Sequence, residues 1–347
     1  MISEFSLKLI LFHYKINYIL TLVGTIFAFG GSICLIGTGL TPTDLVFNSH
    51  VFFANNIFGV ELAEEICNSV KCAEQIRYVS TGGEADMYAM RLARAYTGRS
   101  KILKFEGGYH GMCSEAQMSL APAKLSNFPQ AVPDSAGIPE SVKSEVLVAP
   151  FNDIAFIENI LAEESSEIAG IIVEPLQRLI PPIKNFLPTL RKLCTKYNIL
   201  LIFDEVQSGV GRTGHLYAYM GLGVTPDILT TAKSLGGGFP IGAMLTTADI
   251  AAHLMPGTHS STYGGKPLAC AVAEKALDIV NQPEVLEGVL KKEALFRELL
   301  GAINEKYNVF EEVRGQGMLL GCALNEKYQG RARDFMMAAT KENLMCL

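Results

Sequence analysis

Seven short runs of strand-forming residues recur along this chain of 347 residues, and helical patterns lie between most of them. Several of the runs are continuously apolar, which is typical of strands that are buried on both faces of a sheet. Strands that alternate with helices predict an α/β fold with a mostly parallel sheet covered on both faces. The expected strands are 77–80, 101–105, 145–149, 170–173, 199–203, 228–231 and 242–246.

Residues that can carry chemistry follow several of these strands. Thr81, Tyr109, Asp204 and Lys233 each come at or shortly after the end of a predicted strand. Ligands of parallel sheets collect at the carboxyl ends of the strands. The sequence therefore predicts that these side chains share one site.

Lys233 precedes a glycine-rich turn, and Asp204 ends an apolar run that begins at Leu200. Lysine forms Schiff bases with carbonyl compounds, and enzymes that use pyridoxal phosphate (PLP) pair such a lysine with an acid that keeps the pyridine nitrogen protonated. This pairing is the leading hypothesis. By itself, a lysine before glycines is more often a solvated loop residue.

An apolar strand that ends in Asp-Glu also fits the magnesium-binding strand of a P-loop ATPase. A P-loop requires the pattern G-x-x-x-x-G-K-[ST], whose backbone amides and lysine hold the phosphates. Residues 209–216 lack the lysine, and residues 264–267 lack the hydroxyl residue and have proline where a helix should run. The missing motif argues against nucleotide hydrolysis.

A second glycine-rich turn, at 80–83, lies between the strand-like residues 76–79 and a helical pattern over 85–96. The N-terminus of a helix presents unpaired amides and a positive dipole end to an anion. A strand-to-helix turn without a ligand would use the same glycines. Phosphate binding and a purely structural turn therefore both remain open at this point.

Six stretches, in the same order along the chain, resemble the class III (fold type I) PLP-dependent aminotransferases. The similarity runs from about Phe52 to the C-terminal end and is closest to the glutamate-1-semialdehyde 2,1-aminomutase-like branch. It implies a fold type I PLP-transferase with a PLP-binding large domain over 46–282 and the start of a small C-terminal α+β domain over 283–347. The stretches are 79–86, 105–111, 173–177, 203–209, 231–240 and 261–269.

The resemblance implies catalytic roles for two residues. Lys233 is expected to form the Schiff base with PLP and then to move the proton between the substrate carbon and the cofactor. Asp204 is expected to form an ion pair with the pyridine nitrogen. The implied activity is PLP-dependent transfer of an amino group, as an aminotransferase or as an aminomutase.

The resemblance also implies contacts to the cofactor ring. Tyr109 is expected to stack on one face of the ring and Val206 to press on the other, while Gln207 reaches the ring hydroxyl. Glu174, at the end of a predicted strand, is either an acid near the site or a strand-end cap or dimer-interface residue. His110 is expected to be a structural histidine in the turn.

The cofactor phosphate is expected on the backbone amides and hydroxyl around Thr81, Gly82 and Gly83. Thr262 is expected to reach the phosphate of a neighbouring subunit, as its counterpart typically does in this family. That contact implies a homodimer.

The substrate stays open because the sequence departs from the family pattern. Many class III aminotransferases follow Glu-Pro-x-Gln with a Gly-Glu-Gly-Gly-like turn, whose acid helps to switch an arginine between substrates; residues 178–182 here read Arg-Leu-Ile-Pro-Pro. This shorter turn and residues 105–109 favour the aminomutase-like branch. Residues 206–214 and 232–238 are more typical of ω-amine or acetylornithine-type transaminases.

Composition excludes several other classes. The net charge is −6, and no cluster of basic residues with interleaved aromatic residues is present to bind nucleic acid. The eight cysteines contain no C-x-x-C pair and the six histidines no H-x-x-x-H pair, so no metal site is expected. Reduced thiols in a cytoplasmic protein that binds a small amine or amino acid fit best.

The two ends of the chain are unlike the family. Residues 16–36 are nearly all apolar and long enough to span a bilayer, so a membrane anchor and an ordinary buried segment are both considered for the unmatched region 1–45. The chain stops at Leu347, before the small domain of the family would be complete. A truncated relative with little activity, or a membrane-tethered non-catalytic one, therefore stands as the alternative to an active enzyme.

Overall fold

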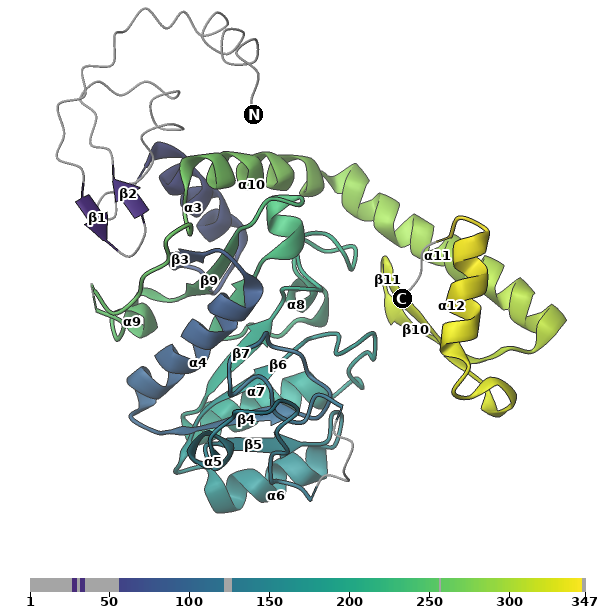
Figure 1. Cartoon of the computed structure of the whole chain (residues 1–347), viewed down its shortest axis with the longest axis horizontal. Coiled ribbons are helices and arrows are strands. Elements are labelled where there is room, and N and C mark those ends of the chain that lie inside the picture. Colours follow the sequence, from purple (N-terminus) through teal and green to yellow (C-terminus); the bar gives the residue numbers. More distant parts are fainter. Residues whose placement is uncertain (1–26, 30–31, 35–55, 122–126, 256, 345–347) are drawn as a thin grey trace, which may run out of the picture.

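A computed structural model describes residues 27–29, 32–34, 56–121, 127–255 and 257–344. Its main body is built around a seven-stranded sheet in the order β3-β9-β8-β7-β6-β4-β5 (Figure 1). The predicted strands are found within two residues of their expected bounds. They are β3 (Gln75–Val79), β4 (Lys101–Phe105), β5 (Val146–Ala149), β6 (Ile168–Val173), β7 (Leu200–Asp204), β8 (Ile228–Thr231) and β9 (Gly242–Thr246).

The sheet is mostly parallel, which confirms the predicted fold class. Strands β5, β4, β6, β7 and β8 run parallel to one another, whereas β9 is antiparallel to both β8 and β3. Because β9 is reversed between them, β3 and β8 point the same way. The carboxyl ends of β3, β4, β6, β7 and β8 therefore lie along one edge of the sheet.

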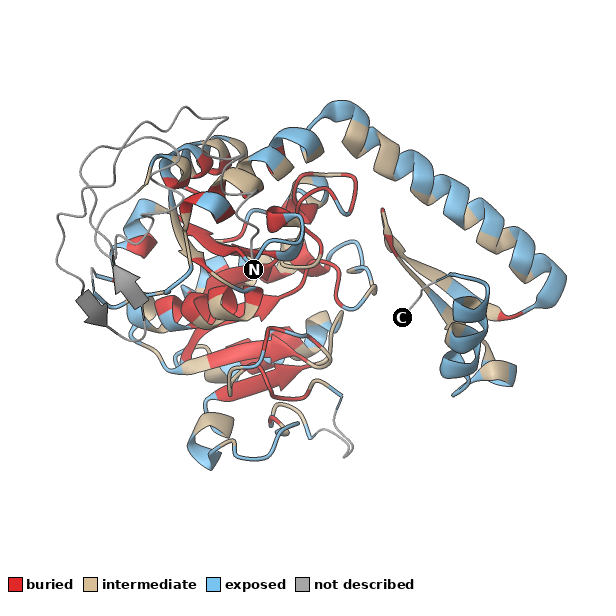
Figure 2. Cartoon of the chain, turned by 45° about the horizontal axis from the view of Figure 1, so that its top comes forward, coloured by how far each residue is buried: buried red, intermediate tan, exposed pale blue. Residues whose placement is uncertain are grey.

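Helices cover both faces of the sheet. Helix α4 packs Ala85, Ala89 and Leu92 against one face, and the opposite face is covered by α3, α6, α7 and α10. Figure 2 shows that the sheet between them is buried. These helices and the shorter ones of the main body are α3 (Ile57–Ser69), α4 (Gly82–Thr97), α5 (Glu140–Lys143), α6 (Ile154–Glu164), α7 (Phe186–Tyr197), α8 (Ala218–Leu222), α9 (Ala248–Ala251) and α10 (Pro267–Val280).

The C-terminal part begins with a long helix, α11 (Pro283–Tyr307). It continues through a hairpin of β10 (Phe310–Gln316) and β11 (Leu319–Leu324), a short turn η2 (Glu326–Tyr328) and α12 (Ala332–Lys341). The hairpin contacts the main body at its tip, where Met318 N–H donates to Arg212 O at 2.9 Å. Figure 1 shows α11 leading away from the sheet to this hairpin.

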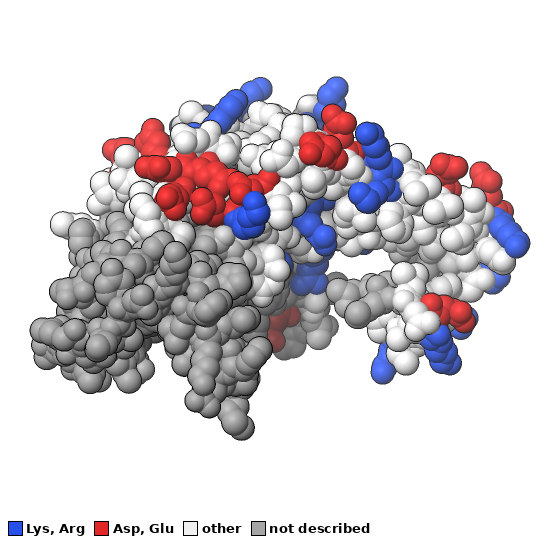
Figure 3. Space-filling view, turned by 90° about the horizontal axis from the view of Figure 1, so that it is seen from above, with Lys and Arg blue, Asp and Glu red and all other residues white. Residues whose placement is uncertain are grey.

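The surface over α3 and α10 is acidic. Glu65 and Glu274 lie near each other and near Asp278, and Figure 3 shows acidic side chains gathered on this side of the molecule. Burial, followed by the neighbouring acids, raises the pKa of both Glu65 and Glu274. An acidic face of this kind repels polyanions.

Most of the apolar segment 16–36 lies outside the described residues. Within it the structure describes only β1 (Phe27–Phe29) and β2 (Ser32–Cys34), which pair antiparallel. Among the helices of the described part, none is both long and apolar enough to cross a bilayer.

Candidate active site

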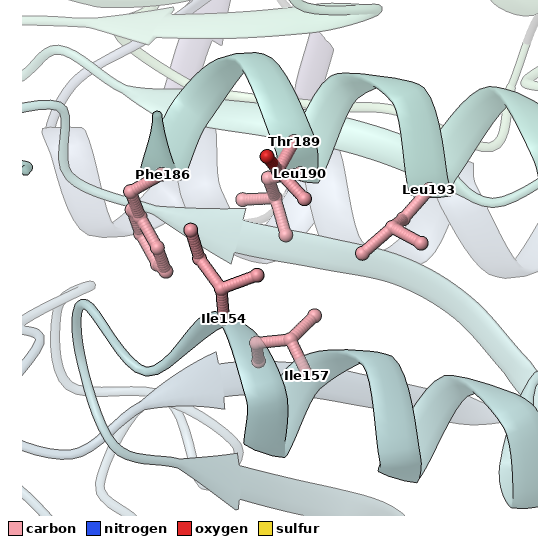
Figure 4. A pocket seen from close by; sticks show the side chains of 6 residues that line it. All are labelled: Ile154, Ile157, Phe186, Thr189, Leu190 and Leu193. Atoms are coloured by element: carbon pink, nitrogen blue, oxygen red, sulfur yellow. The ribbon is translucent and has the colours of Figure 1, made fainter. Parts of the chain in front are cut away.

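A shallow hollow of the surface lies between α6 and α7, and its volume of about 150 Å³ includes open solvent. Figure 4 shows its lining of aliphatic and aromatic side chains, with the hydroxyl of Thr189 as the one polar group. It contains none of the predicted site residues. A ligand site needs polar groups that fix the orientation of the ligand, and this hollow offers one hydroxyl group.

The carboxyl edge of the sheet instead gathers the predicted residues. Thr81 follows β3, Tyr109 lies in the loop after β4, and Glu174 directly follows β6. Asp204 is the last residue of β7, and Lys233 begins the short turn η1 (Lys233–Gly236) after β8. The topology thus brings residues that lie far apart in the sequence to one edge.

The turn before α4 leaves an anion-binding helix end open. Thr81 caps the helix by accepting the N–H of Glu84, while the Glu84 carboxylate accepts the N–H groups of Ser80 and Thr81 at 2.6 and 3.1 Å. No acceptor in the described part of the chain takes the N–H of Gly82 or Gly83. These two amides at the positive end of α4 suit a phosphate group.

Glycines allow the turn before α4 to pack closely against two other loops. A Cβ atom on Gly111, whose φ is +93°, would lie 2.4 Å from the Cα of Gly83. A Cβ atom on Gly82 would lie 2.6 Å from a methyl group of Val206. The predicted phosphate turn, the loop of Tyr109 and the residue predicted to press on the ring therefore form one compact surface.

Asp204 is buried in a network of hydrogen bonds. Its Oδ1 accepts the N–H of Val206 at 3.0 Å, and its Oδ2 lies 2.8 Å from Nδ1 of His110. Burial lowers the pKa of His110, so the ring is neutral and donates its Nδ1 proton to the carboxylate. His110, expected to be structural, is therefore a partner of the predicted catalytic acid.

A second buried acid, Asp86, lies beside this pair. It belongs to α4 and accepts the hydroxyl of Thr230 at 2.6 Å, and ligand-type atoms of Asp86, His110 and Asp204 all lie within 4.8 Å of one another. Side chains of these types can also bind metals. Here Nδ1 of His110 and Oδ2 of Asp204, which would be metal ligands, are hydrogen-bonded to each other. Burial, and then the charge of Asp204, raises the pKa of Asp86 well above its usual value.

Glu174 connects the end of β6 with the tyrosine loop. Its carboxylate accepts the N–H of Tyr109 at 3.0 Å. Burial, followed by the charge of Asp204, raises the pKa of Glu174 to about 8, against the opposing charges of Arg178 and Lys233. Tyr109 is 43% exposed, so it is accessible to a ligand.

Lys233 has an exposed side chain and an unusual backbone. Its φ of +46° lies in the left-handed region, which costs an ordinary residue about 1–2 kcal/mol. The following glycines, Gly237 and Gly238, also have positive φ. Strain of this kind is often stored at functional sites, where the surrounding structure holds it in place.

The two remaining predicted residues lie at the margin of this surface. Gln207 is half-buried just after Val206. Thr262 is exposed, and the hydroxyl of its neighbour Ser261 lies 3.3 Å from that of Ser80 in the same chain.

Two buried charged residues that were not predicted from the sequence, Lys104 and Glu205, stabilise the loops that carry the site. Lys104, inside β4, donates to the carbonyl oxygens of Gly108, Ala116 and Met118, and burial lowers its pKa to about 8. It thereby fixes the loop that carries Tyr109. A lysine within an otherwise apolar strand was the available signal.

Glu205 has a structural role although it adjoins Asp204. Its carboxylate accepts the hydroxyl of Ser208 and the N–H groups of Ala218 and Tyr219 at 2.7–2.9 Å. Burial raises its pKa to about 7. The two adjacent acids therefore have different roles. Asp204 belongs to the candidate site, whereas Glu205 stabilises the segment from Ser208 to Tyr219.

The chain is similar to known aminotransferases over most of its length. The model of the family "Aminotransferase class-III" matches residues 43–347. The acetylornithine aminotransferase of Vibrio parahaemolyticus is 50% identical over 297 residues, which cover 83% of this chain and 70% of that protein.

Solved structures give the same result. An ω-transaminase from Sphaerobacter thermophilus superimposes with a TM-score of 0.79 at 30% identity, over 88% of this chain and 75% of that one. A transaminase with PLP bound superimposes with a TM-score of 0.72 at 28% identity, over 80% and 66% of the two chains.

Proposed function

Because the chain belongs to the class III aminotransferases, which depend on PLP, we propose that it transfers the terminal amino group of N-acetylornithine, or of a similar ω-amino acid, to a keto acid. The 50% identity with an acetylornithine aminotransferase supports this substrate class. The observation that carries the proposal is the convergence of Asp204, Lys233 and the open N-terminus of α4 at one edge of the sheet.

The residues at this edge fit PLP. The amides of Gly82 and Gly83, which have no acceptor among the described residues, suit its phosphate, and the buried carboxylate of Asp204 suits a protonated pyridine nitrogen. The exposed ring of Tyr109 and the methyl groups of Val206 offer apolar surfaces for the two faces of the cofactor ring. Gln207 and Thr262 are proposed to add contacts to the ring hydroxyl and, from a second subunit, to the phosphate.

When bound, PLP supplies a ring that accepts the electron pair of the breaking C–H bond. The amine of Lys233 is proposed to hold the cofactor and then to take the proton from the substrate carbon and return it to a carbon of the cofactor. Asp204 keeps a proton on the pyridine nitrogen, and the hydrogen bond from His110 keeps Asp204 in place. Glu174 positions the tyrosine loop through the N–H of Tyr109.

The aminomutase-like branch was the closest resemblance in the sequence analysis, and the relatives do not support it. They include acetylornithine aminotransferases and a succinylornithine transaminase that is 44% identical. The motifs at 206–214 and 232–238 are more typical of ω-amine or acetylornithine-type transaminases. They were therefore more informative about the substrate class than the turn at 178–182. A homodimer, a large domain over 46–282 and a small domain from 283 remain part of the proposal.

The test begins with the cofactor. The purified chain is mixed with PLP, its visible spectrum is recorded before and after borohydride reduction, and the labelled peptide is mapped. We expect the label on Lys233, its loss in Lys233→Ala, and its retention in the surface variant Lys275→Ala. A protein that stays colourless and unlabelled at Lys233 would contradict the proposal.

The substrate is tested on the same material. N-acetylornithine, a simple ω-amine without a carboxylate and glutamate-1-semialdehyde are each added to the PLP-loaded protein in single-turnover experiments. We expect N-acetylornithine to discharge the visible band fastest. A faster reaction with glutamate-1-semialdehyde, with no release of a keto product, would instead favour an aminomutase.

A further inference from the structure

Two carboxyl groups meet beneath the proposed cofactor site. Asp86 from α4 and Asp204 from β7 are 1% and 3% exposed, and their oxygen atoms lie within 4.8 Å of each other. Water does not screen charges at such a position. Two carboxylates that share a buried site do not both ionise, so the pair retains one proton.

The hydrogen bonds indicate which acid is ionised. Asp204 accepts the N–H of Val206 and the ring N–H of His110, and both bonds favour its charged form. Asp86 accepts only the hydroxyl of Thr230 among the described residues. The proton of the pair therefore belongs on Asp86.

The other groups that face Asp86 do not oppose this assignment. His110 is neutral because burial lowers its pKa, and the pKa values of Glu174 and Cys113 are raised by burial. No cation within the described ranges pairs with the Asp86 carboxyl. Burial and the charge of Asp204 together raise the pKa of Asp86 well above that of an ordinary aspartate.

We propose that Asp86 remains protonated at neutral pH and donates a hydrogen bond to Asp204, so that the pair carries a single negative charge located on Asp204. Thr230 selects the arrangement, because its hydroxyl donates to Oδ1 of Asp86 and leaves Oδ2 to carry the proton. Asp86 is a positioning residue, since it touches Asp204 and not the substrate.

This arrangement affects the proposed chemistry through the proton affinity of Asp204. Three donors, from Val206, His110 and Asp86, stabilise the Asp204 anion. A carboxylate that accepts several hydrogen bonds holds a proton less readily. In a hydrogen bond between Asp204 and a pyridine nitrogen, the proton would therefore stay on the nitrogen. This last step rests on the proposed function, whereas the proton on Asp86 does not.

The protonation of Asp86 is tested by infrared spectroscopy on the full chain. A difference spectrum between the wild type and Asp86→Asn at neutral pH should show the C=O stretch of one protonated carboxylic acid, with a shift in D₂O. The exposed control Asp278→Asn should show no such band. A difference spectrum without a protonated-acid band would overturn the proposal, whether or not the protein binds PLP.

The effect on Asp204 is tested with PLP-loaded protein. Asn at position 86 still offers an N–H to Asp204 and a carbonyl to Thr230, so Asp86→Asn should keep the pH dependence of the cofactor absorbance. Asp86→Leu removes one hydrogen bond to a charged group and should weaken PLP binding about tenfold or more. Equal PLP affinity and equal pH dependence of the cofactor absorbance in the two variants would contradict the positioning role of Asp86. A protonated-acid band in a protein that does not bind PLP would leave the proton on Asp86 established and the proposed function refuted.

Discussion

The Nδ1 atom of His110 lies 2.8 Å from Oδ2 of Asp204, and the two side chains are 1% and 3% exposed. His110 follows Tyr109 in the loop after β4, whereas Asp204 ends β7. This one hydrogen bond therefore links the proposed ring-stacking residue to the proposed partner of the ring nitrogen.

Replacing Asp204 by Asn removes the charge that stabilises a protonated ring nitrogen. We expect Asp204→Asn still to be labelled by PLP at Lys233, with kcat reduced about 10- to 100-fold, because a hydrogen bond to a charged group contributes about 1.5–3 kcal/mol. Steady-state kinetics and peptide mapping measure the two effects. Unchanged turnover would show that the ring nitrogen has another partner.

Glu174 should make stability depend on pH. Its pKa is about 8 in the folded chain and near 4.5 when unfolded. Its contribution is complete below the lower value and decreases as pH rises toward 8, because the unfolded state ionises first. Urea unfolding at a series of pH values should show a decline of a few kcal/mol that is smaller in Glu174→Gln. Parallel curves for the two proteins would refute the raised pKa.

Two glycines provide a matched pair of variants. Gly98→Ala introduces backbone strain only, because its φ is +70° and a Cβ there meets no atom within 4 Å. Gly111→Ala adds a clash with Gly83 to similar strain. We expect a loss of about 1–2 kcal/mol for the first and roughly 1–3 kcal/mol more for the second. Only Gly111→Ala should also weaken PLP binding, as measured by equilibrium titration.

Glu205→Ala should destabilise the fold although Glu205 makes no proposed contact with the cofactor. The substitution leaves the buried N–H groups of Ala218 and Tyr219 without an acceptor. Each unsatisfied group costs about 1–3 kcal/mol, so the free energy of unfolding should fall by roughly 2–6 kcal/mol. Denaturant unfolding measures the change against Glu163→Ala, an exposed control expected to lie within about 0.5 kcal/mol of the wild type.

Arg178 and Leu179 form a tight turn in which both residues have positive φ, +46° and +67°. Asn tolerates this conformation better than Arg. Arg178→Asn should therefore raise the free energy of unfolding by about 0.5–1 kcal/mol. It should also raise the pKa of Glu174 further, because the charge of Arg178 lowers that pKa. A thermal melt and the pH series above measure these effects, and a less stable variant would mean that the Arg178 side chain makes an important contact.

The sequence predicted the sheet well because the strand signal is local. Continuous apolar runs such as 170–173 and 199–203 are buried strands, and the residues that follow them meet at one edge through the parallel topology. Family motifs then selected Asp204 and Lys233 among the polar residues at that edge. The small shifts in strand bounds reflect hydrogen bonding at strand ends, which composition does not encode.

The buried partners of Asp204 were harder to predict. Asp86 lies in a helix that begins at a glycine turn, and only the packing of α4 across the sheet brings it near β7 and Thr230. His110 lies within a recognised motif, but the sequence does not show which way its ring points. The left-handed backbone of Lys233 likewise depends on its surroundings, because lysine has no intrinsic preference for that conformation.

The contact between Gly83 and Gly111 has an evolutionary consequence. A Cβ atom on Gly111 would lie 2.4 Å from the Cα of Gly83, whereas one on Gly83 would lie 3.1 Å from the Cα of Gly111, so a side chain at Gly111 requires the turn before α4 to move. We therefore expect the two loops to change together. A chimaera that takes the tyrosine loop from a relative should recover cofactor binding only when it takes the turn before α4 from the same parent.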